Sequence, residues 1–432
     1  MELLLFQINV ILAILLVLYI SRSIFNGLVY LNYSLLMVAI VGYDPVTILT
    51  PIIFIIGLFS QHIYIRYLKF PLLLKIYIFI FLLFTLLSCC WSPVWNWVIR
   101  FWSGVIFFYF TNLFITSVGL ARKMFFSIIL GTIISSFIAL STLVFDLQLG
   151  SLFFPVFTSF RFAGLYNTTI LGIFSAILII WIIDELLHPK LWEGGIILKF
   201  CLLALYCLQM LSTLTRSAWL GFAVAFSIYL ILELNKINVM RKASIIGILL
   251  LLVTVASMLI TNLDSAETIR KRITVDTFDL TEGEEKRAKF YFTRNALEVA
   301  FQHPFGVGIG NTQKMTETFN GLEVGAHNNL VMVMSDMGWF AFIGFFLLQF
   351  YILWKLLVKA LCSKVKYGLS AQMLFCCNII LFISGMYQDL LLYIPMWLIP
   401  SLSTIVLFPD HYRKLGSFIQ SNGSRVVQCE VI

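Results

Sequence analysis

Four ionisable side chains lie beside apolar segments of the sequence, where chemistry at a membrane surface is possible. They are Arg161, Arg216, His327 and Asp389. Ionisable groups in or next to membrane segments are energetically costly, so each is a functional candidate. A guanidinium donates two hydrogen bonds to a phosphate at once, and an imidazole accepts a proton near neutral pH. These residue types suit the binding of an anion next to a proton acceptor.

The two arginines differ in their surroundings. Arg216 lies in Ser-Thr-Leu-Thr-Arg-Ser-Ala-Trp-Leu-Gly (212–221), where one apolar run ends and the next begins. Its neighbouring hydroxyls could bind the same anion. The alternative is that Arg216 only extends its charged group to the membrane interface, where Trp219 would be part of the aromatic belt. Arg161 directly precedes another apolar run, and structural and functional roles are equally open for it.

The other two candidates flank later apolar runs. His327 is followed by Asn328 and Asn329, either of which could cap the helix that begins there. The alternative for His327 is an interfacial histidine bonded to a carbonyl group. Asp389 falls late in its apolar run. It could be a counter-ion for an arginine or a group that orients His327.

The composition predicts the scaffold that positions these residues. The chain is 61% hydrophobic and 12% charged, with a mean hydropathy of +0.98, whereas soluble proteins carry about twice that charge. Apolar runs of about 20 residues, enough to cross a bilayer, recur along it. Backbone groups in lipid must be paired, so these runs should be helices. The fold class predicted is an all-α polytopic membrane protein with 12 or 13 spans, at 3–20, 24–42, 46–64, 70–90, 95–117, 123–145, 163–184, 195–214, 217–234, 243–261, 328–354, 370–388 and 392–408.

The distribution of basic residues predicts the orientation. Lysines and arginines cluster in alternate connections, and the positive-inside rule makes that side cytoplasmic. The predicted organisation is a first helical bundle (1–261), one large extracytoplasmic loop with short helices (262–326), a second bundle (327–408) and a cytoplasmic tail (409–432).

The long polar loop is the most unusual part of the chain. It carries eight Lys/Arg and ten Asp/Glu, and this mixed charge argues against nucleic-acid binding. Residues 286–302 predict an amphipathic helix with Arg287 and Arg294 on one face, which by itself is typical of a solvated surface. The glycine-rich segment 303–311 predicts a sharply bent connector. No strand precedes it and no helix clearly follows it, so a nucleotide-binding loop is disfavoured.

Taken together, these segments resemble the O-antigen ligase/polymerase superfamily of membrane glycosyltransferases. The resemblance rests on Thr-Arg216-Ser-Ala-Trp, on the outer helix that leads into His-Pro-Phe-Gly-Val-Gly-Ile-Gly-Asn (303–311), on His327-Asn with Gly338 after it, and on Asp389. It covers roughly residues 160–395.

The resemblance implies roles for individual residues. Arg216 would engage the pyrophosphate of a lipid-linked donor, and His327 would help to activate the acceptor. The family usually has a second arginine at the start of the outer helix, where this chain has Lys289, with Arg287 two residues earlier. Arg161 would assist at the pyrophosphate. Asp389, Asn328 and Arg294 would have supporting roles.

The expected function is transfer of a glycan from undecaprenyl pyrophosphate to lipid A–core, at the periplasmic face of the bacterial inner membrane. No cofactor is expected, and no Asp-x-Asp or His/Cys cluster suggests a metal. A polymerase that joins lipid-linked repeat units is the alternative; the single dominant outer loop favours the ligase. A transporter fits less well, because no internal repeat is found and the unusual residues gather at one face. A structural scaffold fits least.

Overall fold

The computed structural model describes residues 70–115, 118–144, 168–188, 195–213, 215–234, 284–320, 326–362 and 369–408, with residues 29 and 52. Every regular element in these ranges is a helix, as predicted. The spans predicted at 3–20, 24–42, 46–64 and 243–261, the tail 409–432 and Arg161 lie outside the described residues, apart from the two single positions.

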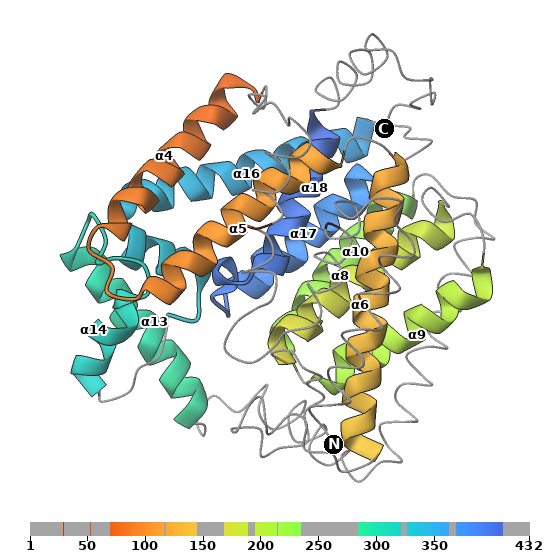
Figure 1. Ribbon diagram of the computed structural model, residues 1–432, viewed down its shortest axis with the longest axis horizontal. Helices are drawn as coiled ribbons and strands as arrows, with labels where there is room; N and C mark the ends of the chain where they lie inside the picture. Colours follow the sequence, from red (N-terminus) through yellow and green to blue (C-terminus); the bar gives the residue numbers. More distant parts are fainter. Residues whose placement is uncertain are drawn as a thin grey trace.

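The helices run in the order that Figure 1 shows. They are α4 (Leu72–Cys89), α5 (Trp95–Phe114), α6 (Val118–Val144), α8 (Thr168–Leu187), α9 (Ile196–Ser212), α10 (Arg216–Leu234), α13 (Glu284–Gln302), α14 (Asn311–Asn320), α15 (Asn329–Met332), the π-helix η1 (Val333–Met337), α16 (Trp339–Cys362), α17 (Ala371–Gly385), the 3-10 helices η2 (Leu390–Leu392) and η3 (Ile394–Trp397), and α18 (Leu398–Leu407). Four described segments are long and apolar enough to cross a membrane: Leu72–Cys89, Thr169–Leu187, Arg216–Glu233 and Trp339–Cys362. A total of about twelve spans stays a prediction.

The core of the bundle is built around α8. This helix is apolar on all sides and almost wholly buried from Ile170 to Ile183, as expected of a helix surrounded by others. It packs against α9, α10 and α17. At one end of this group, the Tyr229 hydroxyl donates to Asp184 Oδ1 at 2.9 Å and joins α10 to α8. Because α8 packs against both α10 and α17, it fixes the positions of these two helices and of the residues at their ends.

The span predicted over 328–354 is wrong as a single helix. The structure breaks it into α15, η1 and α16, and α16 begins only at Trp339 and runs to Cys362. The reason is that the glycine-rich connector binds backbone carbonyls here: the amides of Val307 and Gly308 donate to the carbonyls of Ser335 and Asp336, both at 2.9 Å. The chain then turns at Gly338, whose φ is 92°.

Helices α4 and α16 approach each other closely at Gly344. A Cβ added there would lie 2.8 Å from the backbone nitrogen of Phe81. Only a residue without a side chain allows the two helices to pack at this distance.

Gly344→Leu should therefore destabilise the protein by about 1–3 kcal/mol, the usual range for overpacking. The measurement is the midpoint of thermal unfolding of the protein in detergent. Ile343→Phe enlarges an exposed neighbour on the same helix and should leave the midpoint nearly unchanged. Equal midpoints for the two variants would show that the α4–α16 contact does not depend on this glycine.

Candidate functional site

The segment around His327 is held by a carboxylate through its backbone. The amide of His327 donates to Asp389 Oδ2 at 3.2 Å, and the amide of Asn328 donates to Oδ1 at 3.0 Å. His327 has a φ of 50°, in the left-handed region that residues with side chains seldom adopt. The two hydrogen bonds hold His327 in this conformation at the start of α15.

Asp389 occupies a different place from the one the sequence predicted. It lies in the connection between α17 and η2 rather than late in a helix. Its hydrogen bonds to the backbone of His327 and Asn328 make it a residue that positions this segment. Burial raises the pKa of Asp389 to about 7; the amide of His327 opposes this shift, and the nearby charge of Asp336 adds to it.

A second aspartate, the buried Asp336 of η1, holds the connector that precedes α14. Its Oδ2 accepts from the amide of Gly310 at 2.8 Å, and its Oδ1 accepts from the amide of Thr312 at 3.1 Å. Amides in the first turn of a helix need such acceptors, so Asp336 caps α14 from a distant part of the chain. The expectation that no clear helix follows the connector is wrong for this reason. Burial raises the pKa of Asp336 to about 6.

The bent connector predicted at 303–311 is confirmed, and glycines make it possible. Gly306 has a φ of 80° and Gly338 a φ of 92°. A Cβ on Gly306 would lie 2.6 Å from the nitrogen of Gly338, and a Cβ on Gly338 would lie 2.6 Å from the carbonyl carbon of Phe305. The connector and the start of α16 therefore touch backbone to backbone.

Arg216 is the first residue of α10 and is half-buried. The end of α10 packs on the last turn of α17, where the Ser384 hydroxyl donates to the carbonyl of Ser217 at 3.3 Å. The next residue of α17, Gly385, lies against the Asn329 side chain, since a Cβ added there would be 2.6 Å from Nδ2. The last turn of α17 thus lies between the helix end that carries Arg216 and the segment that follows His327.

The outer helix α13 contacts the same segment. The Thr293 hydroxyl donates to the carbonyl of Ala326 at 3.0 Å, directly before His327. Lys289 lies one helical turn before Thr293 on the same face of the helix. Arg287 is rotated by about 120° from Thr293 around the helix axis. Arg294 is exposed, and its Nε donates to Glu298 Oε1 at 3.2 Å.

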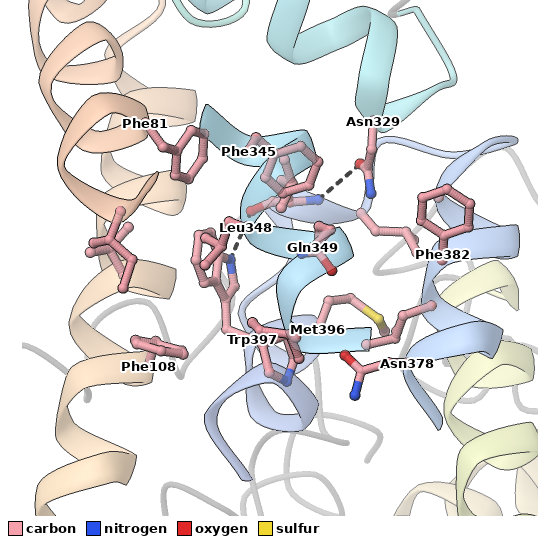
Figure 2. A pocket seen from close by; sticks show the side chains of 18 of the residues that line it. Phe81, Phe108, Asn329, Phe345, Leu348, Gln349, Asn378, Phe382, Met396 and Trp397 are labelled. Atoms are coloured by element: carbon pink, nitrogen blue, oxygen red, sulfur yellow. Dashed lines mark hydrogen bonds between the residues drawn. The ribbon is translucent and has the colours of Figure 1, made fainter. Parts of the chain in front are cut away.

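Asn328 and Asn329 have separate tasks. The Asn328 side chain caps α15 by accepting from the amides of Leu330 at 2.9 Å and Val331 at 3.3 Å, which confirms the predicted cap. Asn329 Oδ1 accepts from the amide of Leu391 at 3.2 Å, as Figure 2 shows. Asn329 therefore joins α15 to η2.

An apolar cavity of about 100 Å³ lies next to Asn329. Figure 2 shows aromatic and aliphatic side chains of α4, α5, α16, α17 and η3 around it, with the amide of Gln349 among them. The lining includes Phe81, Phe108, Phe345, Leu348, Phe382 and Trp397. Engineered apolar cavities of comparable size bind small hydrocarbons. This space is suited to part of a hydrocarbon chain.

Three residues of this site were not predicted from the sequence: Asp336, Thr293 and the cavity residue Gln349. Asp336 and Gln349 are polar residues inside apolar runs, a signal that could have marked them. Thr293 carried no such signal. In the described ranges, no group of three or more His, Cys, Asp or Glu side chains could hold a metal ion.

The raised pKa of Asp389 predicts a pH-dependent stability. The folded protein keeps this carboxyl protonated up to about pH 7, whereas its ordinary pKa is 3.8. The folded state thus binds more protons between these values, and stability should fall as pH rises through this window. The midpoint of thermal unfolding should fall more steeply from pH 4.5 to 7.5 for wild type than for Asp389→Asn. Asp336 is present in both proteins, so the difference between the two curves reports on Asp389. Parallel curves would contradict the assignment of the pH dependence to Asp389.

Comparison with known proteins shows what one part of the chain is similar to. A search of the curated proteins returned no match. Residues 200–346 match the family model described as O-antigen ligase, a range that contains Arg216, α13, the connector and His327. The match and the apolar helices indicate a membrane protein with a glycosyltransferase type of activity. Residues 200–346 of the chain are thus similar to the O-antigen ligase family.

Proposed function

We propose that the protein transfers a glycan from undecaprenyl pyrophosphate to lipid A–core at the periplasmic face of the bacterial inner membrane. The observation that carries the proposal is the packing at the end of α17. There the helix end with Arg216 and the segment after His327 meet the same turn, through Ser384 and Gly385. This packing supports a site in which Arg216 and His327 act together.

Arg216 would stabilise the negative charge that develops on the departing pyrophosphate. A permanently charged, forked donor at a helix N-terminus suits this task, and a site partly closed to water strengthens it. Lys289 is the second basic residue that we assign to the donor, because its register on α13 matches that of Thr293, which touches Ala326. Arg161 and Arg287 are further candidates. Arg294 supports α13 through its pair with Glu298.

His327 would act as the general base. An acceptor sugar hydroxyl gives its proton to the imidazole while its oxygen forms a bond to the anomeric carbon, and the bond from that carbon to the pyrophosphate breaks. Asp389 and Asn328 would keep the imidazole in place through the backbone of this segment. The residues in this scheme need no cofactor.

The apolar cavity supports a lipid-linked donor. Its lining includes Asn329 and Leu390, which directly follow Asn328 and Asp389 in the sequence. A pyrophosphate bound near His327 could therefore extend the first part of its isoprenoid chain into the space between α4, α16 and α17.

The function is tested in a deletion strain that carries plasmid copies of the protein. Wild type should restore full lipopolysaccharide on a gel, while Arg216→Ala and His327→Ala should leave lipid A–core without glycan at normal protein levels. Lys355→Ala removes an exposed basic residue of α16, and it should behave as wild type. Transfer close to wild type by Arg216→Ala would contradict the proposed role of this arginine.

The same gel distinguishes a ligase from a polymerase. Lipid A–core with no glycan in the deletion strain, together with accumulated lipid-linked polymer, identifies a ligase. Single repeat units that are still attached identify a polymerase. An unchanged ladder would refute both for this polysaccharide.

Filling the cavity should change the preference for donor chain length. Leu348→Trp places a larger side chain in the cavity wall, and Leu361→Trp makes the same change at an exposed position of α16. With purified protein, Leu348→Trp should raise KM about tenfold or more for a donor with a full isoprenoid chain, because burial of each CH₂ contributes about 0.8 kcal/mol. KM for a donor that carries a methyl group in place of the isoprenoid chain should not change. An equal effect on both donors would show that the cavity does not receive the chain.

A further inference from the structure

Three phenylalanine rings are exposed where the outer segment meets α16. Phe301 at the end of α13 is 68% exposed, Phe305 in the connector 59%, and Phe340 in the first turn of α16 47%. The mechanism proposed above uses none of them. Exposed groups of large apolar side chains mark surfaces that contact another phase or another molecule.

These rings form one surface with the apolar exterior of two candidate spans. Phe305 lies 6.1 Å from Phe340 and Phe340 lies 4.8 Å from Phe84 of α4, measured between ring centroids. Phe301 lies 5.3 Å from Trp339. Beyond them the exposed side of α16 continues with Ile343, Phe346, Phe350 and Trp354, and that of α4 with Phe79, Leu83, Leu86 and Leu87. A span must present such residues to lipid, so the three rings extend a lipid-facing surface.

The character of α13 changes sharply within one turn. The side chains of Arg294 and Glu298 are 68% and 54% exposed and form an ion pair, which requires water. Phe301, three residues after Glu298, is exposed and aromatic. The boundary between water and the membrane interface can therefore be placed on α13 between Glu298 and Phe301.

We infer that Phe301, Phe305 and Phe340 insert into the interfacial layer of the bilayer, so that the partner of this surface is membrane lipid. Aromatic residues are enriched at that level because their rings are stable between headgroups and chains. The last turn of α13 and the connector are then held at the membrane surface, although neither crosses it.

This contact would set the depth of the site. The connector is bound to η1 by the amides of Val307 and Gly308, and α13 is bound to Ala326 by Thr293. An anchor at Phe301 and Phe305 therefore fixes the distance of His327 from the membrane surface.

The test replaces single residues of the full-length protein with the photoreactive analogue p-benzoylphenylalanine, in nanodiscs of defined phospholipid. The analogue keeps an aromatic ring at 301, 305 or 340 and bonds covalently to C–H groups that it touches when illuminated. Mass spectrometry should find phospholipid adducts at these positions. The same analogue at position 298, one turn away and also exposed, should give a several-fold lower yield.

Phospholipid adducts at 301 and 305 above the yield at 298 would support the inference. Equal yields at the three positions would overturn it, as would crosslinks to a second copy of the chain in place of lipid. The analogue at 340 gives an independent result if one of the other two variants fails to fold. None of these results depends on whether the protein transfers a glycan.

Discussion

The hydrogen bonds from backbone amides to two carboxylates, the buried Asp336 and the half-buried Asp389, are the constraint on which the outer part of the structure depends. Asp336 accepts from Gly310 and Thr312, and Asp389 accepts from His327 and Asn328. Buried polar groups without partners are strongly destabilising, so each carboxylate stabilises the one backbone arrangement that supplies its donors. The position of α14 and the unusual backbone of His327 both follow from these bonds.

The sequence predicted what local patterns determine. In the described ranges, apolar runs other than 328–354 located the long helices to within about six residues. Glycines marked the connector, and a cap at Asn328 or Asn329 was visible beside its helix. It did not predict the break between Asn328 and Trp339, or α14, because these depend on contacts between residues far apart in the chain. The bonds of Asp336 span 24 and 26 residues and those of Asp389 span 61 and 62, and helical periodicity carries no information about such pairs.

The candidate site shows the same division. Residue type alone selected Arg216, His327 and Asp389, because charge beside an apolar run is visible in a sequence. Their arrangement depends on small contacts that are not visible there: the Ser384–Ser217 hydrogen bond and the close approach of Gly385 to Asn329. The choice of Lys289 over Arg287 likewise rests on the contact of Thr293 with Ala326. The catalytic roles of these residues remain predictions.

The π-helix η1 makes the orientation of the preceding segment depend on the exact number of residues in this turn. A π-helical turn holds one residue more than an α-helical turn. A chain lacking a single residue between Val333 and Met337 could close this turn as an α-helix, and everything before it would rotate by about 100° relative to α16. Asn328 and Asn329 would then point away from their partners. A deletion of Met334 would uncouple the two halves of the site while every side chain in it was retained.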